Sequence, residues 1–519
     1  MERAPATAST AKPSLGLTGA TVNAMALIAP GAFLWITFQL QAAATAPSGA
    51  SVAADMWPGI FLALVIALLS AMSYAELARR YPEAGFGSCY YFAEKAFIDR
   101  ENADHHRWAR LAKLVTGWAA HLYYWVYPGT MVAFMATLIG YIYTQVTGGT
   151  LSTGSLILVS VVFACVAGYV AVRGVTGSTM TALVINVVQL TTLVVFTVLA
   201  IGYRTRDAGG GNMWTFASGA DIVLPHTIQG VLIQSTLAIL ILVGFESCTA
   251  LAAETRDAGR NIPRAVILSL LIQGAFAYLF EYFGANYMLS NKLVGTDAHQ
   301  AVVTGMDAVA ASSAPLGDLA ILLGNRMLGG IGFGLMISIA VTVILALLGT
   351  TLSCMNTAAR VSYAMAQDRE MPELLGGLHG RFASPARAIW ALVGVSCVIA
   401  AIGVQSVVGL TGITLASNFG TFALYGMTCL WTLIAFAGAS DASVFKHRVV
   451  PTLGLLANVS MLVAIMYLYI IGGADSKKEA YICFGIAGAW AVVSLLYILV
   501  TSARDRRPLV GTRAFRRAD

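Results

Sequence analysis

The stretch TIQGVLIQSTLAILILVGFESCTAL, residues 227–251, decides the fold of this protein. It is mostly apolar and long enough to cross about 30 Å of hydrocarbon as a helix. Near its end, however, Gly244-Phe245-Glu246-Ser247 places a flexible residue and a carboxyl group inside the run. Since a helix in lipid must satisfy its own backbone hydrogen bonds, an interruption here indicates backbone that lines a cavity. The stretch therefore predicts a broken membrane-spanning helix.

The rest of the chain repeats this apolar pattern. Of its 519 residues, 58% are hydrophobic and only 11% are charged, whereas roughly a quarter of a soluble domain is charged. We expect an all-α membrane protein with one membrane domain, residues 21–503, between a tail of residues 1–20 and a basic tail of residues 504–519. Apolar runs predict about twelve spans, near residues 21–44, 57–78, 114–143, 153–172, 179–203, 227–251, 264–288, 327–363, 386–404, 409–437, 449–471 and 481–502.

Basic residues are segregated between the two sides of the predicted membrane. If the N-terminus is inside, the outward loops hold only six of the 31 Lys and Arg residues, namely Arg204, Arg206, Lys292, Arg326, Lys477 and Lys478. Because cytoplasmic loops carry the excess of Lys and Arg, we expect a multi-pass protein with both termini in the cytoplasm, in a bacterial cytoplasmic membrane. This segregation, rather than nucleic-acid binding, explains the net charge of +6.

Two loops are long enough to hold structure of their own. Residues 87–113, expected inside, mix charged and aromatic side chains and suit either a short interfacial helix or a solvated connector. Residues 289–326, expected outside, contain an Ala- and Val-rich stretch around 298–311. This stretch suits a lid-like helix over an outer vestibule or, equally, a connector.

Several function classes lack their signatures in this sequence. The seven cysteines have no metal-ligand spacing, so we expect neither a metal site nor a cofactor. The chain has no phosphate-binding loop of an ATP-driven pump and no His-Glu-x-x-His helix of a membrane enzyme. A channel would favour a repeated pore loop or a ring of like charges, and is the less favoured alternative. The sequence predicts a transporter of a small organic solute and not an enzyme.

A second interruption lies in the first predicted span, at Ala29-Pro30-Gly31-Ala32. First and sixth are the positions at which an inverted repeat of five plus five spans would place its two broken helices. Pro128-Gly129 also interrupts a run, in the third span. A proline kink without function therefore remains an alternative for each of these sites.

Three motifs resemble the amino acid, polyamine and organocation permeases. The first is Ser73–Gly85 (SYAELARRYPEAG), continued by Tyr90–Phe97 (YYFAEKAF). The second runs from Gly244 through Ala253-Glu254-Thr255 to Arg260–Ala265 (RNIPRA). The third is Asn356–Arg360 (NTAAR) with Tyr363–Pro372 (YAMAQDREMP). The motifs occur in the family's order, and the resemblance covers residues 20 to 500.

This resemblance implies the leucine-transporter-type fold. Repeat one would be residues 21–203, repeat two residues 227–437, and the peripheral helices residues 449–502. In such permeases the substrate lies at the midplane, where amides of the span 1 break cap an α-carboxylate and carbonyls at both breaks meet an ammonium group. With Tyr127 from the aromatic third span, the implied substrate site is Ala29, Pro30, Gly31, Ala32, Phe33, Tyr127, Gly244, Phe245, Glu246 and Ser247.

The sequence departs from the family pattern at Pro30. Proline has no N–H, so one donor to a carboxylate is missing, although Gly31, Ala32 and Phe33 still have theirs. The departure favours an amine or polyamine that needs no α-carboxylate, with an ordinary amino acid as the alternative. The partner is in either case a small molecule, carried by secondary transport in the lipid bilayer.

Coupling to a proton, to sodium or to exchange stays open at the level of sequence. Glu246 lies inside a predicted break and is the expected proton carrier, with a structural role as the alternative. Glu281 would face a vestibule or a polar neighbour, and His121 suits a hydrogen-bonded core residue. Thr350, Thr351 and Ser353 supply hydroxyl groups that either ligate sodium or bond to their own helix. The sequence decides neither the solute, the direction of transport nor the oligomeric state.

Overall fold

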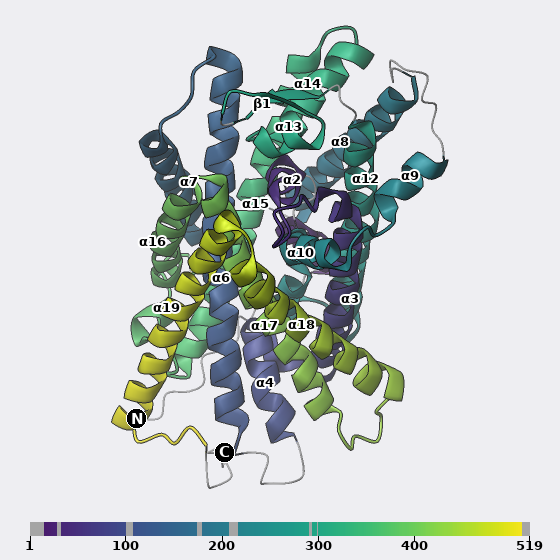
Figure 1. Ribbon diagram of the computed structural model, residues 1–519. Coiled ribbons are helices and arrows are strands. Elements are labelled where there is room, and N and C mark those ends of the chain that lie inside the picture. Colours follow the sequence, from purple (N-terminus) through teal and green to yellow (C-terminus); the bar gives the residue numbers. More distant parts are fainter. Residues whose placement is uncertain are drawn as a thin grey trace.

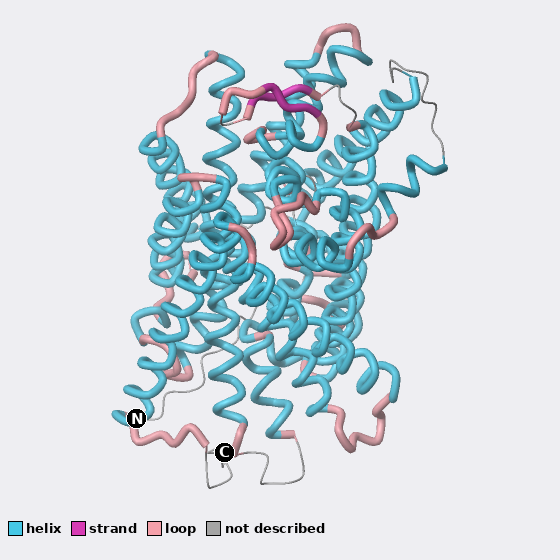
Figure 2. The backbone as a smooth tube through the Cα atoms, in the orientation of Figure 1, coloured by secondary structure: helices cyan, strands magenta, loops and turns pink. Residues whose placement is uncertain are grey.

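The computed structural model describes residues 15–28, 33–99, 107–173, 179–206, 216–289, 293–297, 299–382 and 384–510. In these ranges the chain is almost entirely helical (Figures 1 and 2), which confirms the all-α membrane fold. Eleven described segments are long and apolar enough to cross a membrane. The first predicted span is described as two shorter helices, α1 (Leu17–Ile28) and α2 (Leu34–Ala43), which flank residues 29–32.

The remaining predicted spans coincide with helices. They are α3 (Met56–Arg80), α6 (Ala109–Thr147), α7 (Thr153–Arg173), α8 (Thr179–Arg206), α10 (Ile228–Ala238), α11 (Ala258–Leu270) with α12 (Leu279–Met288), α15 (Gly332–Gln367), α16 (Ala386–Gly403), α17 (Val407–Ala435), α18 (Val450–Ile471) and α19 (Ala474–Arg504). Two π-helical stretches, η5 (Leu271–Tyr278) and η7 (Phe445–Val449), join or precede such helices. Short 3-10 turns occur at η1 (Ala53–Asp55), η2 (Pro82–Gly87) and η6 (Glu373–Gly376).

Helix α6 passes through the middle of the bundle and runs along much of its height (Figure 1). It packs against α4 (Cys89–Ile98), α7, α15, α16 and α17. Pro128 lies inside this continuous helix, so Pro128-Gly129 kinks or bends a helix at most and does not end it. A Cβ atom at Gly129 would lie 2.6 Å from Ile399 Cβ, so the glycine lets α16 approach closely. The local interruption in sequence serves helix packing here.

The two long loops both hold structure, but not entirely as expected. In the segment 87–113, helix α4 buries Cys89, Tyr90 and Phe92 against its neighbours, so it is packed onto the bundle. In the segment 289–326, strands β1 (Val294–Thr296) and β2 (Val302–Thr304) form an antiparallel hairpin. The helix expected around 298–311 is limited to α13 (Met306–Ala311), followed by α14 (Pro315–Met327).

The two ends of the molecule differ in structure and charge. The hairpin end carries β1, β2, α13 and α14, at the top of Figure 1. The basic end carries the opposite ends of α3, α6 and α15, with Arg79, Arg110 and Lys113. Helix α9 (Phe216–Val223) lies between α8 and α10 in the sequence and packs against α12 and α3.

Candidate functional site

The sixth span is broken at Gly244. Helix α10 passes into the 3-10 turn η3 (Ile239–Ile241), residues 242–244 form turns, and the chain continues as the 3-10 helix η4 (Phe245–Glu254). Gly244 has φ +121°, a conformation that side chains other than hydrogen strain. A Cβ atom there would lie 2.9 Å from Leu27 Cβ and 3.1 Å from Ile28 N. Both conformation and space require glycine, and the break lies directly against the end of α1.

Glu246 is tied to this break by one of its two oxygen atoms. The Gly244 N–H donates to Glu246 Oε2 over 3.0 Å, and the Tyr425 hydroxyl donates to the same atom over 2.8 Å. Oε1 is buried and has no hydrogen-bond partner among the described residues. In the described part of the chain, no Lys, Arg or His forms an ion pair with Glu246 either. Hydrogen bonds to Oε2 therefore orient the carboxyl group, while Oε1 remains able to accept a hydrogen bond from a ligand.

Aromatic side chains from three spans surround the break. The Phe245 ring lies 5.1 Å from that of Tyr425 and 6.0 Å from that of Tyr74, measured between centroids. On α6, Tyr123 and Tyr127 are 5.4 Å apart and fully buried. The hydroxyl groups of Tyr74, Tyr123 and Tyr127 have no hydrogen-bond partner among the described residues. Buried polar groups are rarely left unpaired, so this cluster has the character of a ligand site.

The end of α1 shows how the other half of the site is held. A helix leaves its last carbonyl groups without partners inside the helix. Here Gln273 Nε2 donates to Met25 O over 3.0 Å, and the Tyr278 hydroxyl donates to Ile28 O over 2.8 Å. Ala29, Pro30, Gly31 and Ala32, named from the sequence as site residues, lie outside the described residues. Phe33 follows them, buried, with its ring 6.4 Å from that of Tyr127.

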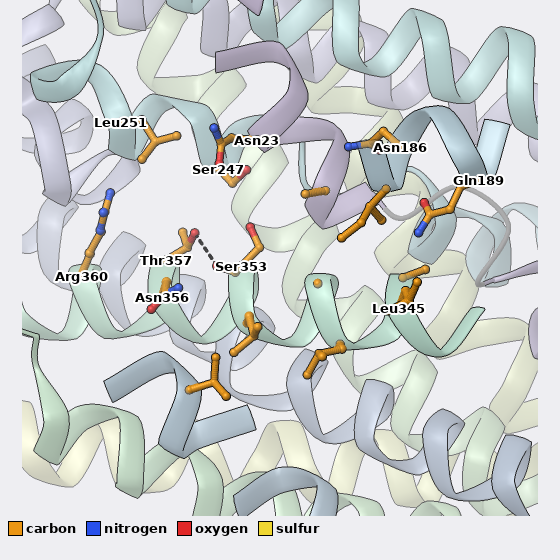
Figure 3. Close-up of a pocket in the computed structure, with 17 residues that line it drawn as sticks. Asn23, Asn186, Gln189, Ser247, Leu251, Leu345, Ser353, Asn356, Thr357 and Arg360 are labelled. Carbon is orange, nitrogen blue, oxygen red and sulfur yellow. Dashed lines mark hydrogen bonds between the residues drawn. The ribbon is translucent and has the colours of Figure 1, made fainter. Parts of the chain in front are cut away.

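A cavity of about 310 Å³ opens beside the break, between α1, α7, α8, η4 and α15 (Figure 3). Among the described members of the substrate site expected from the sequence, Ser247 alone lines it. The remainder of its polar wall comes from carboxamides and hydroxyls, namely Asn23, Asn186, Gln189, Ser353, Asn356 and Thr357. A polar stripe on α15 is formed by residues at helical spacing, Ser353, Asn356, Thr357 and Arg360, of which the prediction from sequence included only Ser353.

Arg360 forms part of the cavity wall toward the basic end. Its Nη2 lies 3.1 Å from Glu254 Oε1, and its Nη1 donates to Ala250 O over 3.4 Å. These bonds join α15 to the last turns of η4. The pair is partly exposed, so it can form and break at modest cost.

The coupling candidates lie in different surroundings. The Thr350 hydroxyl donates to Ala26 O over 3.2 Å, whereas Thr351 donates to Leu347 O of its own helix over 2.7 Å. Ser353 lines the cavity. Glu281 is completely buried, facing no vestibule, and neither of its oxygens has a hydrogen-bond partner among the described residues.

His121 has the surroundings of a packed core residue. Its Nδ1 lies 2.6 Å from Gly117 O and its Nε2 lies 2.9 Å from Ser362 Oγ. Both ring nitrogens are therefore engaged, by one carbonyl and one hydroxyl group.

The hairpin end is closed by packing. Helices α13 and α14 pack on α2, whose residues Leu34–Ala42 are buried, and Gln39 Nε2 donates to Ala310 O over 3.4 Å. On α14, Asp318 accepts hydrogen bonds from Ser312 and from the Tyr141 hydroxyl of α6. Burial raises the pKa of Asp318 above its ordinary value, and these two hydrogen bonds act in the opposite direction.

At the basic end, ion pairs and hydrogen bonds of α6 link it to the segments that follow α15 and α19. Arg110 of α6 binds both oxygens of Glu370 with distances of 2.8 and 2.9 Å, and both side chains are buried. Arg110 also donates to Arg507 O over 2.6 Å, which attaches the segment after α19. Lys113 pairs with Asp368 at 2.8 Å.

Comparisons with known proteins agree with this architecture. The family model described as amino acid permease matches residues 15–503. An uncharacterized transporter of Mycobacterium tuberculosis is 27% identical over 86% of each chain. The low-affinity putrescine importer PlaP of Escherichia coli K12 is 24% identical, also over 86% of each chain. A methylthioribose transporter of Bacillus subtilis is 23% identical over 75% of this chain and 76% of its own.

The relatives are transporters, and the spans, the broken sixth helix and the cavity beside it are what a multi-pass carrier requires. Since the family model covers nearly the whole chain, this protein belongs to the amino acid permease family, within the amino acid, polyamine and organocation superfamily.

Proposed function

We propose that this permease is a secondary transporter of a small cationic amine, and that Glu246 binds the ammonium group of the substrate. The observation that carries the proposal is the free Oε1 of a buried carboxyl group within a cluster of tyrosines. Glu246 Oε2 is fixed by Gly244 and Tyr425, so Oε1 has a defined direction.

The chemistry of this cluster suits a cation. A carboxylate in a buried site attracts an ammonium group strongly, because water does not screen the interaction. Aromatic faces such as those of Phe245 and Tyr425 add cation–π attraction. The unpaired hydroxyls of Tyr123 and Tyr127 supply further acceptors for an N–H group.

The relatives support a small organic solute and leave room for a second candidate. One relative is named for the import of putrescine, an amine, and another for the transport of methylthioribose. The second candidate is an α-amino acid, which the family's description favours. Its carboxylate would need amide donors near Gly31 and Phe33, beside Pro30, which has none.

We further propose alternating access, with the basic end in the cytoplasm. The distribution of Lys and Arg supports this orientation. In the conformation described, α13 and α14 close the hairpin end, while the cavity lies on the other side of the break. Substrate would leave Glu246 past Ser247 into this cavity, and the Arg360–Glu254 pair would have to open on the way.

Competition in proteoliposomes tests the substrate class. Putrescine should compete with labelled substrate at least as well as ornithine, and a simple monoamine at least as well as its parent amino acid. Strong competition by amino acids with none by their amines would overturn the amine proposal and support the second candidate.

Variants test the role of Glu246. Glu246→Gln and Tyr425→Phe each remove a charge or hydrogen bond of a kind worth about 1.5–3 kcal/mol, so substrate affinity should fall about 10- to 150-fold. Tyr469→Phe is the matched control, because Tyr469 is also buried but lies on peripheral helix α18, where its hydroxyl shares a hydrogen bond with Thr236 of α10 and not with Glu246. Unchanged affinity in Glu246→Gln would exclude Glu246 as the ammonium ligand.

A further inference from the structure

We propose that Glu281, in the seventh span, binds and releases the proton that drives transport. The inference rests on the proposed transport function and adds a coupling site to it, separate from the substrate carboxylate Glu246.

The first observation is the absence of partners in a fully buried position. Both oxygens of Glu281 are buried and form no hydrogen bond with any described residue. A structural role would provide such bonds, as it does for Asn418, which donates to Thr236 O over 2.7 Å. An ionised carboxylate without donors is very costly inside a membrane protein. In this conformation Glu281 is therefore the neutral acid, with its proton bound.

Comparison with Glu246 sharpens the assignment. Glu246 Oε2 already accepts from Gly244 N–H and the Tyr425 hydroxyl, and hydrogen bonds donated to a carboxylate favour its ionised form. Glu281 has no such donors among the described residues. The hydrogen bonds of Glu246 therefore suit a carboxylate that meets a cation, whereas the surroundings of Glu281 suit a group that changes its protonation.

The second observation is the place of Glu281 on α12. Tyr278, one turn before it, donates to Ile28 O at the end of α1 over 2.8 Å. Tyr282, the next residue, shares a hydrogen bond with Thr37 of α2. Residues three and four apart lie on one helix face, so Tyr278 and Tyr282 mark the face that holds both halves of the first span, with Glu281 beside it.

This placement links the carboxyl group to a moving part. A change in the angle between α1 and α2 must break or lengthen the bonds of Tyr278 or Tyr282, because each binds a different half. Such a change loosens the packing around Glu281 and admits water. The carboxylate takes a proton from hydronium in one conformation, forming one O–H bond and leaving a water molecule. The same bond breaks when the group next meets water on the opposite side.

The titratable and charged groups around this part of α12 leave the site uncompensated. They are Tyr278 just before the helix, Tyr282 on it, Tyr127 on α6, Arg204 on α8, Asp55 before α3, Asp221 on α9 and His226 after α9. Arg204 donates to the carbonyls of Tyr287 and Leu289 at the end of α12, and Asp55 accepts from the backbone of Thr227. None of the described charges forms an ion pair with Glu281.

The test separates coupling from exchange in proteoliposomes that hold the full chain. Wild-type protein should accumulate labelled putrescine, or the best substrate from the competition assay, when an inward proton gradient is imposed. A gradient of about one pH unit supports about tenfold accumulation for one proton per substrate. Glu281→Gln should lose this accumulation and the substrate-induced proton uptake seen by a pH-sensitive dye, while exchange without a gradient stays within about twofold.

Two variants control the result. Glu281→Asp keeps a titratable group and should restore part of the gradient-driven accumulation. Glu479→Gln removes a partly buried carboxyl group from peripheral helix α19 and should leave coupling unchanged. Thermal unfolding in detergent checks that each variant is folded.

Each other outcome decides against one of the two proposals. Accumulation and proton uptake that persist in Glu281→Gln overturn the coupling role, and so does a wild-type protein that transports without response to the proton gradient. Loss of exchange in both Glu281→Gln and Glu281→Asp, with lowered unfolding temperatures, assigns Glu281 a structural role instead. A wild-type protein that neither accumulates nor exchanges any amine or amino acid overturns the transport proposal itself.

Discussion

The two ends of this permease are held together by different forces. At the hairpin end, α13 and α14 pack on α2. Partly buried hydrogen bonds add to this packing, from Gln39 to Ala310 O and from Tyr141 to Asp318. At the basic end, charged groups join α6, α15 and the segment after α19, and the Arg360–Glu254 pair borders an open cavity. Close packing resists small changes in any one side chain, whereas a partly exposed ion pair contributes little to stability and can break at modest cost. The difference predicts which substitutions change stability and which change access.

The largest effect is expected at the buried ion pair of the basic end. Arg110→Met leaves Glu370 buried without its bidentate partner, and removal of one partner from such a pair costs about 3–5 kcal/mol. The unfolding temperature in detergent should fall clearly, and the Arg110→Met, Glu370→Met double variant should recover much of the loss. A single variant as stable as wild type would show that this pair does not hold the basic end together.

A smaller loss is expected at the break between the two ends. Gly244→Ala forces a methyl group into φ +121° and against Leu27, a strain of about 1–3 kcal/mol. Transport should drop more than stability, because the break must move against α1. Gly394→Ala on α16 is the matched control, since a Cβ atom there meets no neighbour within 4 Å. Equal transport rates in both variants would show that transport does not require the break at Gly244 to move against α1.

At the hairpin end, Asp318 should give the closure a pH dependence. Its pKa is raised by burial, so its contribution to stability is complete below the pKa of the unfolded chain and is lost as the pH rises through the folded-state value. Asp318→Asn should therefore gain unfolding temperature relative to wild type as the pH increases. Parallel pH profiles would mean that Asp318 is equally charged in the folded and unfolded chains.

Tyr141→Phe removes the hydroxyl donor to Asp318 and should cost about 1–2 kcal/mol. The same unfolding measurements, made at acidic pH, where Asp318 is neutral, and near neutral pH, provide the check. A cost that is larger when Asp318 is charged would support the hydrogen bond, while no cost at either pH would contradict it.

The smallest effect is expected for Arg360→Gln. The pair with Glu254 is partly exposed, and such pairs contribute about 0–1 kcal/mol. Stability should hardly change, while the access of a thiol reagent to a Ser353→Cys probe in the cavity should rise about two- to fivefold. A large loss of stability would show that the Arg360–Glu254 pair contributes as much as the buried Arg110–Glu370 pair, which contradicts the difference proposed between them.

The sequence identified the spans, the family and the break at Gly244, because each of these has a local signature. It also showed an interruption at Pro128-Gly129, for which a proline kink without function was one interpretation; the structure has continuous helix α6 there, and Gly129 packs closely against α16. The hairpin from Val294 to Thr304 was missed, because its strands are too short to show a clear alternation. The polar stripe on α15 was visible in the sequence, but only the cavity gave it meaning.

By itself, the sequence determined where the chain crosses the membrane, since every backbone group in lipid must bond within its own helix and hydropathy reports this locally. Only the tertiary structure decided which side chains reach the free carbonyls of α1: Gln273 for Met25 and Tyr278 for Ile28, each hundreds of residues away. The same holds for the two buried carboxyl groups. In the sequence, Glu246 and Glu281 are both single carboxyl groups within apolar runs. The break brings the Gly244 N–H to Glu246, and α17 brings it the Tyr425 hydroxyl. Packing brings Glu281 no donor among the described residues.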